Sequence, residues 1–402
     1  MSRRRVVITG VGVVCACGIG PEAFWDALAR GTSGLGPIRR FDSSRLATRI
    51  GGEVDLPNLA APPSGDRLTW NSLENTKAFL AWEAIRQIHH LVPKESGLIT
   101  TVGLERIDLE AITGTLVPEA LICPEVPPVV LPGILWRKAG FTGPVSTQVA
   151  ACAAGTLAIG QAFRLIRQGW ATSLVAGGVD SLLFPFGIHA FNSIGALSEK
   201  NERGAAALMP FDRHRSGTLL GEGAGYLLLE EAEQALQEGR EPLAEILGFG
   251  GSMDAFHPVM PDPTGRGATL AMTRALEDAR QTPDAVDYIN AHGTGTWHND
   301  VMEAKAILTV FGDRGRVLPV SSSKPFFGHL LTAAGAVEAV ASLLPFRRGL
   351  LPPTLHWQTP DPDIPLDCVP ETGRETRARV VMSNSYGLGG QNASLLFGRW
   401  QP

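Results

Sequence analysis

One cysteine and two histidines could carry out chemistry together. Cys152 stands among small uncharged residues, where an extended segment gives way to a helical pattern. His292 and His329 lie far downstream, each in a glycine-containing stretch that is typical of a loop at the end of a strand. A thiol and two imidazoles that meet in space can support acyl transfer through a covalent intermediate. Acyl transfer is therefore the first hypothesis for this chain.

The residues after Cys152 predict a helix over Gly155–Gln168 that is buried nearly all round, because its first charged residue is Arg164. The amino end of a helix presents unpaired N–H groups and a partial positive charge. A thiol placed there has its pKa lowered from about 8.5 to roughly 3.5–7.5. The sequence thus predicts an ionised Cys152. A small buried cysteine that only packs is the alternative, but the neighbouring alanines leave backbone room for a substrate.

The surroundings of the two histidines also favour a reactive site, although a single loop histidine is more often structural. Two neutral imidazoles can each donate an N–H to an oxygen that becomes negative during a reaction. Lys324 lies five residues before His329, and Glu338 lies on the helix that follows. We expect a partly buried ion pair between Lys324 and Glu338 that fixes the loop of His329. An ordinary surface lysine is the alternative.

A glycine-rich loop near the end of the chain could complete the site. Three glycines fall within four residues of the stretch 384–392, and such a loop needs close backbone approach or positive φ. One of its N–H groups could form an oxyanion hole with the N–H of Cys152. The Gly10-Val11-Gly12 stretch is a poor dinucleotide site, because Cys15 occupies the place of the third glycine.

Composition excludes several classes of function. The net charge of −5, with no basic run beyond residues 3–5, gives no reason to expect nucleic acid or an anionic membrane as partner. No stretch of about 20 apolar residues predicts a membrane span. The five cysteines are odd in number and lack framework spacing, which favours a reducing compartment and a cytoplasmic protein. Cys15 and Cys17 have one residue between them and no second pair nearby, so no metal site is expected.

The chain of 402 residues, 44% of them hydrophobic, is long enough for two packed halves or one duplicated architecture. Short apolar runs predict buried strands at Val6–Thr9, Ser173–Gly178, Ala224–Leu229, Tyr288–Ala291, Val317–Ser321 and Val380–Asn384. Helical patterns alternate with them at Pro21–Arg30, Asn75–Ile88, Gly155–Gln168, Gly267–Ala279, Asp300–Phe311 and Ala333–Leu344. The pattern predicts an α/β protein with helices covering mixed sheets.

We divide the chain into an amino-terminal half, residues 1–240, that carries the cysteine and a carboxy-terminal half, residues 241–402, that carries both histidines. A proline-interrupted stretch at about 56–142 is expected to be a loop-rich excursion on the first half. The Gly/Pro-rich stretch Gly248–Gly267 is expected to be a loop that opens the second half.

These residues together resemble the β-ketoacyl-acyl carrier protein synthases, the condensing enzymes of the thiolase fold. The resemblance is strong over 145–398 and weak over about 56–142. The motifs that carry it occur in the family's order, at Ala151–Gly155, Ala176–Gly178, Pro210–Arg213, Gly221–Gly225, Ala291–Thr294, Ser322–His329 and Gly335–Glu338.

The resemblance implies a thiolase-like fold of layers αβαβα and a triad of Cys152, His292 and His329. Cys152 would take an acyl group from a carrier-protein thioester, and the histidines would stabilise the enolate formed when malonyl loses carbon dioxide. A β-ketoacyl thioester would result, in fatty acid or polyketide-type elongation.

The resemblance also implies the remaining residues and partners of the site. Lys324 should pair with Glu338, and the N–H groups of Cys152 and Leu388 should form the oxyanion hole. The substrate-binding residues should be Thr294, Thr296, Phe191 and Leu388. No metal or free cofactor is implied, because the substrates ride on the phosphopantetheine of an acyl carrier protein. The chain should form a homodimer, or a heterodimer with a ketosynthase-like subunit.

Three departures from the family pattern bear on the substrate. The family usually has Phe where Leu388 stands, and Val259 stands where a further Thr is expected on the pantetheine channel. The family's glycine-rich segment that lines the acyl pocket is not recognisable around Gly97–Gly114. We therefore predict an unusual acyl chain or partner.

Two rival functions remain. A non-elongating chain-length factor would pair with a ketosynthase, but such subunits generally lack the nucleophile. A coenzyme A-dependent thiolase-type acyltransferase would need a second cysteine as base, and no other cysteine lies in a matching motif.

Overall fold

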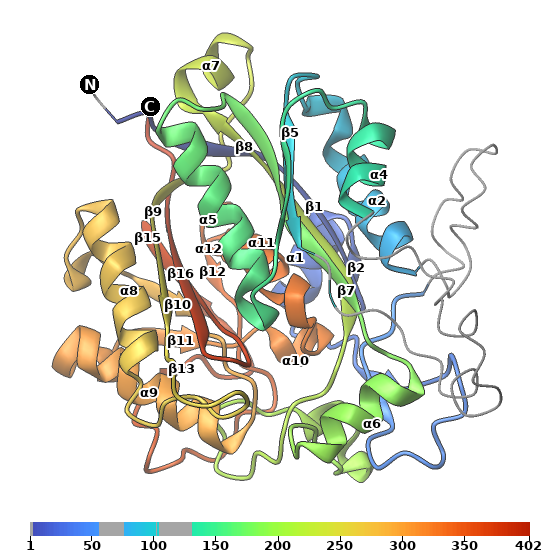
Figure 1. The fold of residues 1–402 in the computed structure, drawn as a ribbon. Coiled ribbons are helices and arrows are strands. Elements are labelled where there is room, and N and C mark those ends of the chain that lie inside the picture. The colour runs from blue at the N-terminus through green and yellow to red at the C-terminus, as the bar shows by residue number, and fades with distance from the viewer. Residues whose placement is uncertain (1–2, 56–75, 102, 104–130) are drawn as a thin grey trace.

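The computed structural model describes residues 3–55, 76–101, 103 and 131–402. Over these ranges the chain forms a large mixed sheet with helices on its outer faces and in its middle (Figure 1). Two sets of strands make up this sheet, and they join where the first residues of β1 (Val6–Cys15) pair with β9 (Ala244–Met253).

The described strands repeat one arrangement twice. In the first set the order is β6 (Val145–Gln148), β5 (Gly97–Thr101), β7 (Ser173–Ser181), β8 (Glu222–Glu231) and β1. In the second it is β11 (Pro319–Ser321), β10 (Tyr288–Asn290), β15 (Val380–Tyr386), β16 (Gln391–Gly398) and β9. In each set the first three strands are parallel and the last two are antiparallel to their neighbours. We propose that the boundary between the halves falls near residue 240, between α7 (Ala232–Gln237) and β9.

Helices lie in three layers around the two sets of strands. The helices α2 (Thr76–Ile88) and α4 (Leu131–Ala139) cover the outer face of the first set, while α8 (Arg266–Ala279) and α9 (Trp297–Phe311) cover that of the second. Between the sets lie α5 (Ala154–Arg167) and α11 (Ala334–Ala341). This order of layers is the αβαβα arrangement that the family resemblance implies.

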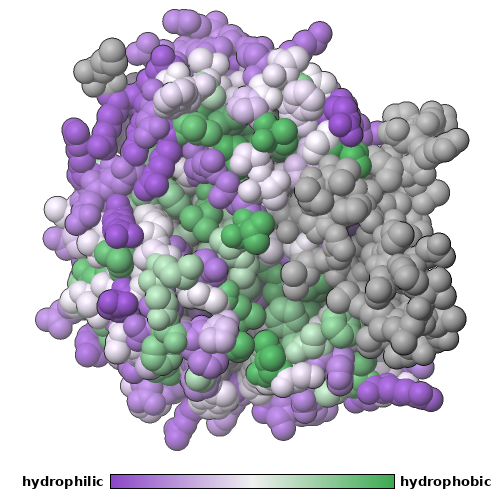
Figure 2. All heavy atoms as spheres, in the orientation of Figure 1, coloured by the Kyte–Doolittle hydropathy of each residue, from purple (hydrophilic) through white to green (hydrophobic). Residues whose placement is uncertain are grey.

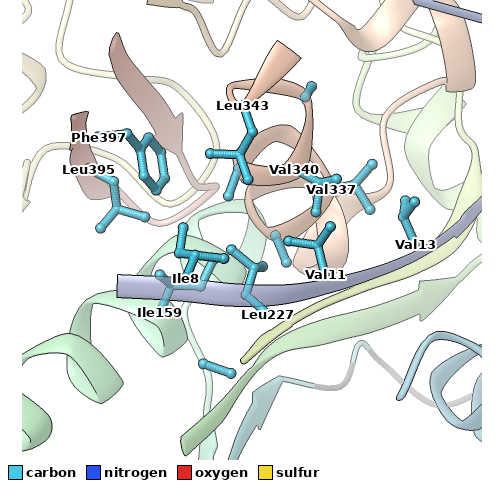
Figure 3. Close-up of a cluster of buried hydrophobic side chains, with 14 of the residues drawn as sticks. Ile8, Val11, Val13, Ile159, Leu227, Val337, Val340, Leu343, Leu395 and Phe397 are labelled. Atoms are coloured by element: carbon cyan, nitrogen blue, oxygen red, sulfur yellow. The ribbon is translucent and has the colours of Figure 1, made fainter. Parts of the chain in front are cut away.

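The two central helices cross at a pair of glycines. A Cβ atom at Gly155 would lie 2.7 Å from the backbone N of Ala336, and one at Gly335 would lie 2.1 Å from Oγ1 of Thr156. No side chain fits at either position, so the backbones of α5 and α11 approach closely. Buried aliphatic side chains from both helices and the neighbouring strands surround this contact, among them Ile8, Val11, Ile159, Leu227, Val337 and Val340 (Figure 3).

The prediction of a loop over Gly248–Gly267 is wrong for its first residues, because β9 continues to Met253. Gly248 and Gly250 face α8, where Cβ atoms would lie 2.4 Å from the carbonyl oxygen of Ala275 and 2.0 Å from that of Ala271. These glycines permit a helix to pack tightly on a strand rather than forming a turn. The strand β16 follows directly on the glycine-rich loop of residues 387–390 and was not predicted.

The remaining elements are short or lie at the margins. Within the segment 56–142, residues 56–75, 102 and 104–130 fall outside the described ranges; the rest forms α2, the 3-10 turn η3 (His89–Leu91), β5 and α4. Other helices are α1 (Pro21–Arg30), α6 (Pro185–Ser193), α10 (Lys324–Phe327) and α12 (Leu344–Arg348). Further 3-10 turns are η5 (Ala151–Ala153), η6 (Asn201–Ala207), η7 (Pro283–Ala285), η8 (Gly312–Arg316) and η9 (Leu331–Ala333).

Short strands also lie beside the main ones. They are β2 (Gly18–Ile19), β3 (Gly36–Pro37), β4 (Ile50–Gly51), β12 (Leu350–Leu351), β13 (Asp367–Cys368) and β14 (Arg374–Glu375). Of the helices in the described ranges, none is both long and apolar enough to cross a bilayer.

Candidate active site

Cys152, His292 and His329 line one cavity of about 330 Å³. Cys152 lies in η5 between β6 and α5, while His292 follows β10 directly. His329 lies between α10 and η9, after β11. In each half, a 3-10 turn that leads into a central helix therefore lies beside this cavity: η5 before α5 in the first half, and η9 before α11 in the second. The structure brings together the three residues that the sequence singled out.

The thiol of Cys152 is buried, with 5% of the residue exposed. Burial raises its pKa to about 11, although a hydrogen bond from the backbone N–H of Leu388 and the charge of Lys324 act in the opposite direction. The prediction of an ionised thiol in the resting protein is therefore wrong. The amino end of α5 does lie at the cysteine, but the loss of water around the sulfur outweighs the groups that favour the thiolate. The proton must leave the sulfur when a substrate reacts.

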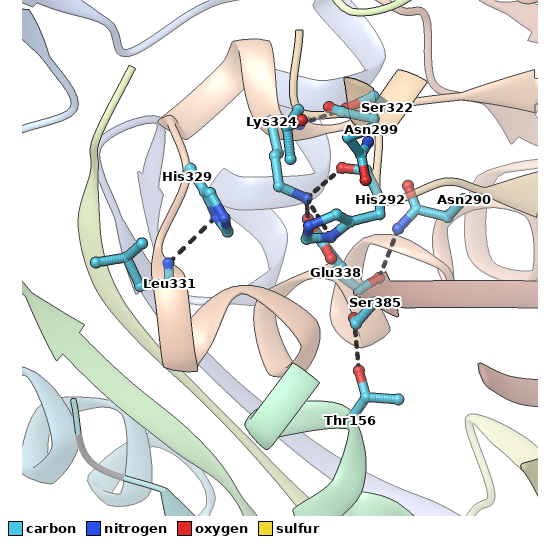
Figure 4. A network of polar contacts seen from close by, with 12 residues as sticks. Thr156, Asn290, His292, Asn299, Ser322, Lys324, His329, Leu331, Glu338 and Ser385 are labelled. Atoms are coloured by element: carbon cyan, nitrogen blue, oxygen red, sulfur yellow. Dashed lines mark hydrogen bonds and ion pairs between the residues drawn. The ribbon is translucent and has the colours of Figure 1, made fainter. Parts of the chain in front are cut away.

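Both imidazoles are neutral at pH 7. Burial lowers the pKa of His292 and of His329 well below 6.5, and the charge of Lys324 lowers both further. The Nζ atom of Lys324 lies 3.2 Å from Nδ1 of His292, and the backbone N–H of Leu331 donates to Nδ1 of His329 over 3.3 Å (Figure 4). A lysine ammonium and a backbone N–H can only donate, so each Nδ1 accepts. Each ring therefore carries its hydrogen on Nε2.

The two rings lie edge to face. Their centroids are 5.4 Å apart, with planes at 80°. Tyr386, on β15, also packs against His292, with ring centroids 5.6 Å apart and planes at 68°. His292 therefore has two aromatic neighbours.

Lys324 and Glu338 form an ion pair between α10 and α11, and neither side chain is exposed. The same ammonium also donates to the carbonyl oxygen of His292. Burial raises the pKa of Glu338, while its contact with Lys324 lowers it. The sequence predicted this pair as partly buried; it is completely buried and touches His292 rather than His329 directly (Figure 4).

Two acidic side chains that the sequence did not single out hold the loop of His292. Glu303 accepts hydrogen bonds from the N–H groups of His292 and Gly293, at 2.9 and 2.8 Å. Asp300 accepts from those of Thr294 and Gly295, at 3.1 and 3.2 Å. Both acids lie on α9, three residues apart, directly after the histidine loop. Two acidic residues at that spacing on a helix with a buried face were a signal that could have been used.

The other predicted substrate-binding residues also line the cavity. They are Phe191 on α6, Thr294 and Thr296 in the loop before α9, and Leu388, and the Oγ1 atoms of the two threonines lie 2.9 Å apart. Val259 lines the cavity too, where the family pattern led us to expect a threonine. Because the N–H of Leu388 reaches the sulfur of Cys152, the backbone of this loop lies at the reactive atom.

Within the described ranges, no group of three or more His, Cys, Asp or Glu side chains is placed to hold a metal ion. The cysteines in these ranges are Cys15, Cys17, Cys152 and Cys368, and all are free thiols. Cys123 lies outside the described residues.

Comparison with known proteins places these residues in a family. Residues 3–67 and 105–235 match the family described as Beta-ketoacyl synthase, N-terminal domain, and residues 243–358 match Beta-ketoacyl synthase, C-terminal domain.

Curated relatives cover the whole chain. It is 37% identical to 3-oxoacyl-[acyl-carrier-protein] synthase 2 of Synechocystis sp., over 100% of this chain and 99% of the relative. It is 39% identical to the protein of the same name from Coxiella burnetii, over 99% of each. The identity with the tetracenomycin polyketide synthase ketoacyl synthase alpha subunit of Streptomyces glaucescens is 36%, over 98% of this chain and 97% of the relative.

Solved structures agree. The ishigamide ketosynthase/chain length factor superposes with a TM-score of 0.87 at 32% identity, over 100% of both chains. A type II polyketide synthase acyl-carrier protein in complex with its ketosynthase, bound to a hexaketide, gives a TM-score of 0.85 at 29% identity, over 99% of this chain and 100% of that one. The expected thiolase-like fold is confirmed, and the chain belongs to the β-ketoacyl synthase family.

Proposed function

We propose that this protein catalyses the decarboxylative Claisen condensation of an acyl thioester with a malonyl group carried on acyl carrier protein, in fatty acid or polyketide-type chain elongation. The product is a β-ketoacyl group on the carrier protein. Family membership and the named relatives support this reaction. The residue roles given below are part of the proposal.

Cys152 is the proposed nucleophile. Its sulfur attacks the carbonyl carbon of the incoming thioester, the bond from that carbon to the carrier sulfur breaks, and the thiol proton passes to the departing thiolate. Because burial raises the pKa of Cys152 to about 11, the sulfur carries its proton at rest and must lose it during acyl transfer. The N–H groups of Cys152 and Leu388 form the proposed oxyanion hole for the carbonyl oxygen.

The two histidines are the proposed donors for the second step. Malonyl thioester loses carbon dioxide, and the electron pair left behind forms an enolate whose oxygen accepts the Nε2–H of each ring. The enolate carbon then attacks the acyl group on Cys152, so that a carbon–carbon bond forms, the carbon–sulfur bond breaks, and the released Cys152 thiolate takes up a proton from water. A neutral imidazole still donates its Nε2–H, so the low pKa of each ring is compatible with this role.

The observation that carries the proposal is the meeting of one thiol and two neutral imidazoles in one cavity. A chain-length factor does not elongate the chain, so it would not need a nucleophilic thiol beside two imidazoles. A thiolase would need a second thiol, and no other cysteine of the described ranges lines this cavity.

The partner that delivers substrate is an acyl carrier protein, whose phosphopantetheine arm would reach Cys152 past Thr294 and Thr296; no other cofactor enters the proposal.

A second ketosynthase-like subunit, identical or different, is the other expected partner. The strand β6 lies at the margin of the sheet, and Val149, just after it, is 88% exposed. Figure 2 shows hydrophobic residues gathered in the middle of one face, with polar residues along its upper and lower margins. We place the protein in the cytoplasm, where its thiols stay reduced.

The test is intact-protein mass measurement after incubation with a panel of acyl carrier proteins that bear chains of different length, with Cys152→Ala as control. We expect the wild-type protein to gain the mass of one acyl group and to form a β-ketoacyl product when malonyl carrier is added. Acylation of the Cys152→Ala protein, or wild-type protein that neither acylates nor condenses with any carrier, contradicts the proposal.

A further inference from the structure

Thr332 occupies in the second half of the molecule the place that Cys152 occupies in the first. Each is the second residue of a 3-10 turn, η9 or η5, that leads into one of the two central helices. Each also follows a residue with positive φ, Leu331 at 48° and Ala151 at 44°. Residues other than glycine rarely adopt this conformation, and it persists only where the surroundings hold it. The turn at Leu331 therefore needs a group that fixes it.

That group is the carboxylate of Asp180, at the end of β7. Its Oδ2 atom accepts two hydrogen bonds from Thr332, one from the backbone N–H at 3.1 Å and one from the hydroxyl at 3.0 Å. The same hydroxyl also lies 3.2 Å from the carbonyl oxygen of Val179. Asp180 is 1% exposed, and Nζ of Lys77, on α2, lies 3.8 Å from its Oδ1 atom. A carboxyl group of the first half thus holds a turn of the second half. Burial raises the pKa of Asp180, while the charge of Lys77 and the bonds from Thr332 lower it.

The turn that Asp180 holds also sets the state of His329. The N–H of Leu331, one residue before Thr332, donates to Nδ1 of His329 over 3.3 Å. If Thr332 moves, the peptide of Leu331 turns with it and this N–H leaves the ring. His329 could then carry its hydrogen on Nδ1, and Nε2 would have none to donate.

A buried ion pair is weak evidence of a purely stabilising role. Taking Lys77 and Asp180 out of water is costly, and apolar residues of similar size often serve stability as well or better. Because Thr332 donates directly to Asp180, the pair of Lys77 and Asp180 instead serves to fix the position of the turn. Among the described residues, no carboxylate accepts a hydrogen bond from the other turn, where the reactive group is Cys152 itself.

We infer that Asp180, acting through Thr332 and the Leu331 N–H, is a positioning residue that keeps His329 in the Nε2–H tautomer and in the orientation that decarboxylation requires. The inference rests on the proposed function, in which His329 stabilises the enolate.

The test measures kcat and KM for malonyl-carrier decarboxylation and condensation with the wild-type protein, Asp180→Ala, Thr332→Val, Thr332→Ser and His329→Ala, and with Asp180→Ala combined with His329→Ala. Asp180→Ala should lower kcat about tenfold with KM within about twofold, since a displaced reacting group costs rate rather than binding. Thr332→Val should lower kcat about fivefold, and Thr332→Ser, which keeps the hydroxyl, should recover it. In the His329→Ala background, Asp180→Ala should have less than about a twofold effect, because the residue it positions is gone.

Equal losses from Asp180→Ala in both backgrounds would overturn the inference, and so would a Thr332→Val enzyme with the wild-type kcat. If Asp180→Ala fails to fold, the pair Thr332→Val and Thr332→Ser decides the question alone. Absence of condensation by the wild-type protein would instead contradict the proposed function, so the two failures are distinguishable.

Discussion

The Nζ atom of Lys324 lies 3.2 Å from Nδ1 of His292, and the lysine side chain is completely buried. The same ammonium is paired with Glu338, which fixes its position. Its charge in turn determines which nitrogen of His292 carries the hydrogen. An ammonium has no acceptor, and His292 therefore has its hydrogen on Nε2 for as long as Lys324 is in place. The ion pair links the packing of α11 to the chemistry of the histidine loop.

Replacing Lys324 with Met should lower the free energy of unfolding by about 3–5 kcal/mol, because the charge of Glu338 is left buried without a partner. The double variant Lys324→Met with Glu338→Leu should recover most of that loss while condensation stays impaired, since Nδ1 of His292 has lost its donor. Urea denaturation and condensation rates check the two parts. Lys200→Met, at an exposed lysine, is the control and should change stability by less than about 0.5 kcal/mol. A double variant with wild-type activity would refute the proposed role of Lys324.

The reactivity of Cys152 should increase steadily with pH through the alkaline range. The thiolate is the reactive form, and burial raises the pKa of Cys152 to about 11. The rate of alkylation by iodoacetamide should therefore rise about tenfold for each pH unit between about pH 7 and pH 10, without a plateau. Peptide mass spectrometry of the fragment that contains Cys152 gives this rate, with Cys152→Ala as blank. A plateau near neutral pH would show that the helix end overcomes the burial of the sulfur.

The local sequence pattern was enough to predict most of the helices and strands. It failed where a contact with a distant part of the chain decides the conformation of a residue. The run Val6–Thr9 and the helix over Pro21–Arg30 were identified from hydrophobicity and spacing alone. Gly248 and Gly250 indicated a loop, yet they lie in β9 because α8 leaves no room for a Cβ. The pKa of Cys152 could not be predicted for a similar reason. The helix end is visible in the sequence, whereas the depth of burial depends on residues that are distant in the chain, among them Ile38, Leu220 and Leu331.

The loop of Leu388 should influence which acyl chains the enzyme accepts. Leu388 lines the cavity that contains Cys152, and its backbone N–H reaches the sulfur. Replacing Leu388 with Phe puts a larger ring beside the reacting atoms, so kcat/KM for long or branched acyl carriers should fall about tenfold relative to short ones. Competition assays with mixed acyl carriers measure this ratio.

A matched control for that change is Val259→Thr, also at the cavity wall and 37% exposed. A hydroxyl there should improve binding of the carrier-bound arm without altering chain preference. If both variants shift the chain preference equally, or if neither does, Leu388 does not select the acyl chain.

The stability of the protein should depend on pH through Glu303, which holds the loop of His292. Burial raises the pKa of Glu303 from 4.5 to about 7, although the N–H groups of Gly293 and His292 lower it. Between these two pH values the folded protein keeps a proton that the unfolded chain has released. The neutral carboxyl therefore contributes stability that is complete below about pH 4.5 and is lost as pH rises through about 7.

Glu303→Gln has no proton to lose, so it isolates this contribution. The free energy of unfolding of the wild-type protein, minus that of Glu303→Gln, should fall by roughly 2–3 kcal/mol between about pH 5 and pH 8. Urea unfolding at a series of pH values measures the difference, and Glu277→Gln, at an exposed carboxyl on α8, controls for the removal of one acidic group. Curves for the wild-type protein and Glu303→Gln that stay parallel would mean that Glu303 is ionised in the folded protein throughout. In that case the N–H groups of His292 and Gly293 would donate to an ionised carboxylate, and the negative charge would strengthen both hydrogen bonds.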